Sequence, residues 1–79
     1  MISLKRALAD LSIGETGRIL RVEGPAAIRN RLREMGLTVG VLVRLVRTAP
    51  FGDPLELHLR GYRLSLRRAE AAGVIVEGA

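Results

Sequence analysis

Apolar residues recur with two different periods along this chain, and the change of period separates the predicted helices from most of the predicted strands. In residues 3–11, SLKRALADL, apolar side chains recur at helical spacing and Ser3 is a suitable N-cap, so this stretch predicts a short N-terminal helix. A turn with two glycines follows. Residues 18–23, RILRVE, then predict the first strand.

The clearest helical pattern covers residues 24–36, GPAAIRNRLREMG. Gly24 suits the N-cap, Pro25 suits the first helical position because an N–H there would have no partner, and Gly36 suits the C-terminal end. The predicted helix is amphipathic, and its apolar stripe consists of Ile28, Leu32 and Met35.

From residue 41 onward the period becomes two, which is typical of strands with one buried face. Leu55, Leu57 and Leu59 alternate with polar residues, and Gly61 makes a tight connection to the next strand. The strands predicted in this half are residues 41–49, 55–61, 62–67 and 74–78, with one helical turn at 67–73. Five short strands and one clear helix predict a mainly β fold, and closure into a small barrel would remove exposed sheet edges.

The composition bounds the fold class and the kinds of site. A chain of 79 residues predicts a single domain over residues 1–79, and 48% hydrophobic residues suffice for a core. The absence of cysteine excludes disulfides and thiolate zinc sites and fits a reducing cytoplasm. No apolar run reaches the ~20 residues of a membrane span, and Lys5, Arg6 and Asp10 interrupt any signal-peptide pattern. We therefore expect a soluble, cytoplasmic protein.

The net charge of +5 favours a partner with negative charge. Nucleic acid, an anionic lipid face and an acidic protein surface all meet this description. Phe51 and Tyr62 are the only aromatic residues, too few for a platform that stacks bases. Nucleic-acid binding by a small basic barrel therefore stays open only as the alternative function.

No constellation of catalytic residues is recognisable, so we predict a protein that is not an enzyme and that uses no cofactor and no metal. His58, the only histidine, points outward from its predicted strand, and we interpret it as a surface residue rather than a ligand or an acid–base group. Asp53, between Gly52 and Pro54, is typical of a turn whose carboxylate accepts hydrogen bonds from nearby backbone N–H groups.

Two long stretches, RNRLREMGLTVG at 29–40 and APFGDPLELHLRGYRLSLRRAEA at 49–71, resemble the FeoA family of small cytosolic proteins associated with bacterial ferrous iron uptake. Together with spaced leucines and a glycine near the start, the resemblance covers roughly residues 8–77. The sequence departs from the family pattern at Phe51, where leucine is more common.

The resemblance implies an SH3-like barrel, in agreement with the strand count. The expected fold is thus a mainly β, SH3-like barrel of about five strands, with one α-helix between the first two strands and a short N-terminal helix. The resemblance also implies a regulatory accessory role, acting on FeoB, the membrane transporter with a cytoplasmic G-protein domain.

The apolar ring near the tip of the turn at residues 49–56 raises two hypotheses. Phe51 either folds over one end of the barrel and seals it, or it is an exposed anchor for a partner protein. The arginines form either a solvated face or a patch for an acidic partner. We predict the partner-binding residues to be Arg31, Met35, Phe51, Arg67 and Arg68, with plain core packing as the alternative for Met35. A leftover strand edge would also permit weak self-association.

Overall fold

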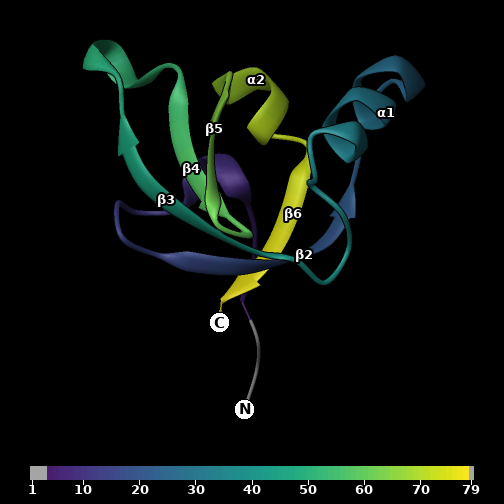
Figure 1. The fold of residues 1–79 in the computed structure, drawn as a ribbon, viewed down its shortest axis with the longest axis horizontal. Helices are drawn as coiled ribbons and strands as arrows, with labels where there is room; N and C mark the ends of the chain where they lie inside the picture. The colour runs from purple at the N-terminus through teal and green to yellow at the C-terminus, as the bar shows by residue number, and fades with distance from the viewer. Residues whose placement is uncertain (1–3, 79) are drawn as a thin grey trace.

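The computed structural model describes residues 4–78 and contains six strands with short helical segments between them (Figure 1). The strands are β1 (Lys5–Ala7), β2 (Thr16–Val22), β3 (Leu42–Thr48), β4 (Leu55–Leu59), β5 (Tyr62–Leu66) and β6 (Val74–Gly78). The α-helices are α1 (Ala26–Glu34) and α2 (Arg68–Ala71), and the 3-10 turns are η1 (Leu8–Asp10) and η2 (Pro50–Gly52).

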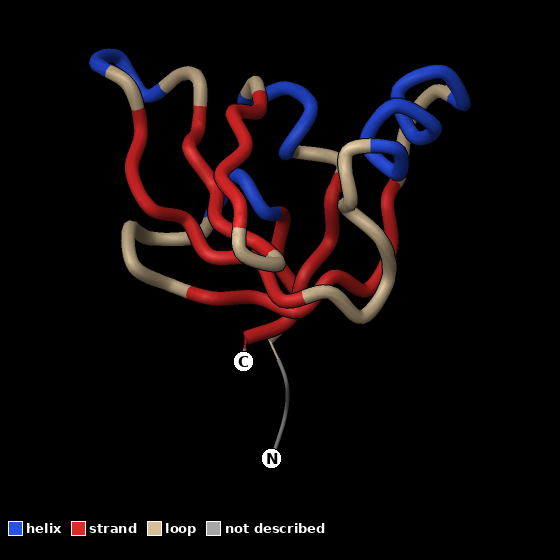
Figure 2. The backbone as a smooth tube through the Cα atoms, viewed as in Figure 1, coloured by secondary structure: helices blue, strands red, loops and turns tan. Residues whose placement is uncertain are grey.

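All strand pairs are antiparallel, and the strands lie in the order β1-β6-β2-β3-β4-β5. The sheet curls around the core, and η2, α2 and α1 lie at one end of it (Figure 2). The predicted mainly β fold with one clear helix is therefore confirmed. β1 and β5 are the two ends of the strand order.

The N-terminal segment is a strand and a 3-10 turn, so the predicted helix over residues 3–11 is wrong. β1 pairs with β6, placing Lys5 opposite Glu77, and η1 then buries Leu8 in the core. Because β6 is at the far end of the sequence, local apolar spacing could not reveal this pairing, and tertiary contacts override weak local propensity. The same strand raises the count from about five to six, and α1 lies between the second and third strands. Ser3, the proposed cap, lies outside the described residues.

Helix α1 is shorter than predicted at both ends. Pro25 occupies the N-cap, one position later than expected. At the other end, the N–H of Gly36 donates to the carbonyl of Arg33 at 3.0 Å, and the N–H of Leu37 donates to that of Leu32 at 3.0 Å. This pair of bonds satisfies carbonyls that the last helical turn leaves free, and it needs a left-handed residue at Gly36, whose φ is 100°.

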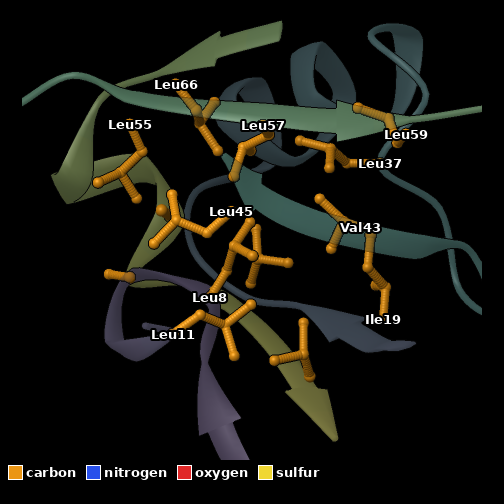
Figure 3. Close-up of a cluster of buried hydrophobic side chains, with 14 of the residues drawn as sticks. Leu8, Leu11, Ile19, Leu37, Val43, Leu45, Leu55, Leu57, Leu59 and Leu66 are labelled. Atoms are coloured by element: carbon orange, nitrogen blue, oxygen red, sulfur yellow. The ribbon is translucent and has the colours of Figure 1, made fainter. Parts of the chain in front are cut away.

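Most core side chains come from strands β2 to β6, from η1 and from the segment after α1, and each α-helix adds one (Figure 3). The alternating leucines of β4 point inward as predicted, and within residues 4–78 no charged or polar side chain is fully buried. Helix α1 contributes one fully buried side chain, Leu32, while Ile28 and Met35 pack against the core and stay partly exposed. Most of α1 is therefore open to other molecules.

Candidate partner-binding site

Phe51 lies at the tip of the connection between β3 and β4, and its side chain is fully exposed. Its exposure is 107% of the reference value for phenylalanine. The backbone at Phe51 has φ 73° and ψ 7°, a left-handed conformation that residues other than glycine rarely adopt. Phe51 therefore does not seal the barrel, and its role as an anchor stays a prediction.

The ring of Phe51 gains no burial on folding, and its backbone conformation costs free energy. Burying an aromatic ring would contribute about 2 kcal/mol of hydrophobic free energy, which the exposed ring does not supply. The left-handed backbone costs a non-glycine residue roughly 1 kcal/mol more. Local costs of this kind cluster at sites that bind or switch, so Phe51 is the first candidate for a contact residue.

Arg68 fixes the turn that presents Phe51. Its backbone N–H donates to the carboxylate of Asp53 at 2.9 Å, and its Nε donates to the carbonyl of Gly52 at 3.0 Å. A third bond, 2.7 Å long, runs from the guanidinium to the carbonyl of Ala9 in η1. Arg68 thus joins α2, η1 and the tip. The sequence predicted a local hydrogen bond for Asp53, whereas this bond spans 15 positions.

Arg67 and Arg68 are both exposed, but only the guanidinium of Arg68 donates hydrogen bonds to the turn and to η1. Together with Asp53 and Pro54, Arg67 lines a hollow of about 270 Å³. Its backbone N–H donates to the carboxylate of Glu70 at 3.1 Å, which caps the start of α2. No ion pair among residues 4–78 involves the guanidinium of Arg67, so it is available next to the tip.

A cross-strand ion pair supports the base of the turn. Arg47 of β3 lies opposite Glu56 of β4, and the two side chains form two hydrogen bonds, one of them 3.1 Å long. The hydrogen bonds from Arg47 are the main cause that lowers the pKa of Glu56. This pair stiffens the hairpin below Phe51 and leaves neither charge free for a partner.

Of the two remaining predicted residues, Arg31 belongs to α1 and Met35 is the C-cap directly after it. Arg31 forms an ion pair with Glu70 of α2, so α1 and α2 are tied together. The side chain of Met35 packs partly on the core, and its carbonyl accepts a hydrogen bond from the hydroxyl of Tyr62. The predicted set is therefore split into a group at the tip and a group on α1. Figure 1 shows the tip, α2 and α1 along the same end of the molecule.

A groove between α1 and α2 was not apparent from the sequence. It has a volume of about 350 Å³, and its walls are residues 23–25 and Ile28 on one side and Ala69, Glu70, Ala72 and Gly73 on the other. Gly73 allows the two walls to approach, because a Cβ there would lie 2.6 Å from the carbonyl oxygen of Glu23. That glycine was the only local signal, and its meaning depends on a contact 50 positions away in the chain.

The described part of the chain offers no cluster of three or more His, Cys, Asp or Glu residues that would hold a metal ion. His58 is exposed on β4, as expected. Among the same residues, 4–78, no helix has the length and apolar character to cross a membrane.

Comparison with known proteins decides the family. The family model of the FeoA domain matches residues 6–78, nearly the whole chain. The chain belongs to the FeoA family. The family has a role in ferrous iron transport, as the resemblance implied.

Three relatives resemble this FeoA chain in sequence or in structure. It is 40% identical over 70 residues to an Fe(2+) transport protein A/Fe(2+) transporter FeoB fusion protein of Porphyromonas gingivalis; the match covers 89% of this chain and 8% of that much longer protein. A FeoA-like protein from Clostridium acetobutylicum has a TM-score of 0.88 at 32% identity, covering 99% of this chain and 90% of the other. The FeoA of Stenotrophomonas maltophilia, solved with zinc and described as a prokaryotic SH3 domain protein, has a TM-score of 0.76 at 31% identity, covering 96% and 89%. The SH3-like fold is therefore confirmed.

Proposed function

We propose that this protein is a non-enzymatic, cytoplasmic regulator of ferrous iron uptake that binds the cytoplasmic G-protein region of a FeoB-type transporter. The fusion of the two in the Porphyromonas relative supports the choice of partner, because fused domains commonly act together. The observation that carries the choice of surface is Phe51, a fully exposed ring on a turn that Arg68 holds in place.

An exposed aromatic anchor on a rigid turn suits a protein interface for two reasons. Burying the ring on binding recovers the hydrophobic free energy that folding left unused. The turn is already ordered in the free protein, so binding loses little conformational entropy there. Arg67 beside the ring adds a charge at the rim, and aromatic and arginine side chains are the ones that dominate binding energy at interfaces.

The test is calorimetry of this protein against the purified cytoplasmic domain of FeoB from the same organism, with and without a GTP analogue. We expect saturable binding that Phe51→Ser weakens by at least about tenfold, the size of a moderate hot spot. The melting temperature of Phe51→Ser should stay close to that of the wild type, because the ring contacts no core. A difference between nucleotide states would show that the G-protein cycle controls binding.

Val39→Ser is the matched control, because Val39 is another apolar side chain that is mostly exposed, at 71%, and lies at the loop after α1. We expect it to bind FeoB like the wild type. Equal affinities for the wild type and Phe51→Ser would contradict the proposed surface, and no binding in either nucleotide state would contradict the proposed partner domain.

A further inference from the structure

Three cationic or titratable side chains form a row across the outer face of β3, β4 and β5, away from the tip. Arg44 lies directly opposite His58, and His58 lies directly opposite Arg63. All three residues are exposed. Directly opposite residues on one face of an antiparallel sheet have Cβ atoms about 5 Å apart, so these side chains are immediate neighbours. We call Arg44, His58 and Arg63 the cationic row.

Nothing in the described structure neutralises the cationic row. No ion pair within 4 Å among residues 4–78 involves Arg44 or Arg63. The charge of Arg63 contributes to the lowered pKa of Glu56, but the carboxylate of Glu56 is hydrogen-bonded to Arg47. Arg44 and Arg63 lie on either side of His58, two strand spacings or about 10 Å apart. They therefore present two unpaired positive charges on one face of the sheet, and an acidic segment laid across the row could pair with both.

The cationic row lies in a hollow that also has an apolar wall. Arg44, His58 and Arg63 line a hollow of about 360 Å³ together with Ile13, Gly14 and Val46. Ile13 is 65% exposed, so an apolar side chain stands beside the charges. No aromatic ring lines the hollow, so it has no surface on which a base would stack.

We propose that the cationic row binds an acidic segment of a protein partner, with carboxylates over Arg44 and Arg63 and an apolar side chain against Ile13. Charge complementarity argues for the acidic segment, and the apolar wall argues for a peptide rather than a nucleic acid. The site is distinct from the Phe51 tip and does not depend on the identity of the partner bound there. It would let this small domain contact two surfaces at once.

The experiment uses the whole protein, labelled with ¹⁵N, and a short synthetic peptide of glutamates with one central leucine. We expect saturable NMR shifts centred on the amides of Arg44, His58 and Arg63, weakening as salt is added. The double variant Arg44→Glu/Arg63→Glu should lose affinity for the peptide by at least about tenfold. The control Arg29→Glu/Arg33→Glu changes the net charge equally on the exposed face of α1 and should keep the affinity.

Several outcomes would overturn the proposal. One is an equal loss of peptide affinity in the two double variants, and another is a set of NMR shifts centred on α1. A third is saturation of the row by inorganic phosphate or by single-stranded DNA but not by the peptide. If the charge-reversed variant does not fold, Arg44→Gln/Arg63→Gln replaces it. This neutral variant should lose the peptide while its melting temperature stays close to that of the wild type, because both side chains are exposed and neither forms an ion pair within residues 4–78. A neutral variant that keeps the peptide affinity would also refute the proposal.

Discussion

Two independent constraints restrict position 36 to glycine. Its φ of 100° suits glycine alone, and a Cβ there would collide with the Tyr62 hydroxyl, which donates to the carbonyl of Met35. We expect Gly36→Ala to lower the free energy of unfolding by about 2 kcal/mol, the sum of a left-handed penalty and overpacking. Urea denaturation followed by circular dichroism measures this loss.

Gly40 and Tyr62 provide the controls for this residue. Gly40 also has a positive φ, 90°, but a Cβ there would meet nothing within 4 Å, so Gly40→Ala should lose only about 1 kcal/mol. Adding Tyr62→Phe to Gly36→Ala should recover part of the loss by removing the hydroxyl. If Gly36→Ala and Gly40→Ala prove equally stable, the close approach of Tyr62 does not matter.

At the scale of elements, Arg68 is the link between α2, η1 and the β3–β4 turn. We expect Arg68→Ala to cost about 2 kcal/mol of unfolding free energy, because hydrogen bonds made by a charged group are worth more than neutral ones. Amide exchange at Gly52 should accelerate in this variant, because the turn loses its tie to α2. Urea denaturation and hydrogen exchange read out the two effects.

Arg67→Ala is the neighbouring control for the Arg68 link. Its side chain is exposed, so the free energy of unfolding should change by less than about 0.5 kcal/mol. Arg67→Ala should instead weaken binding to the partner of the Phe51 tip. Equal destabilisation by the two alanine variants would mean that Arg68 does not link these elements.

At the scale of the whole molecule, stability depends on pH through carboxylates that arginines hold ionised. Hydrogen bonds from Arg6 and then from the backbone of Ser12 lower the pKa of Glu15 to about 2, from 4.5. A pKa lowered in the folded state means stability that is complete above the unfolded value and lost as the pH falls toward the folded one. We expect the melting temperature to fall between pH 5 and pH 2, and thermal melts across that range measure it.

Glu15→Gln should flatten that pH profile, because it removes the carboxylate that becomes protonated. The variant should be less stable than the wild type near pH 7 and closer to it near pH 2. Glu34→Gln, which removes one negative charge from the exposed surface of α1, should leave the profile unchanged. An identical pH profile for the wild type and Glu15→Gln would show that the Arg6–Glu15 pair does not contribute.

The sequence by itself determined those features that depend on near neighbours. The period of two in β4, the stripe and the terminal glycine of α1, and the family motifs at residues 29–40 and 49–71 are local patterns. They correctly predicted β4, the helix and the FeoA family. The five candidate contact residues were also chosen locally. The sequence could place Phe51 on a turn, but the turn alone allowed both a buried and an exposed ring.

The tertiary structure decided everything that joins distant segments. β1 is a strand because β6 pairs with it, Phe51 is exposed because Arg68 fixes its turn, and Arg44, His58 and Arg63 form one row because of strand register. Each of these depends on contacts between residues far apart in the chain. Such contacts add free energy only once the chain has closed on itself, and no local pattern records them.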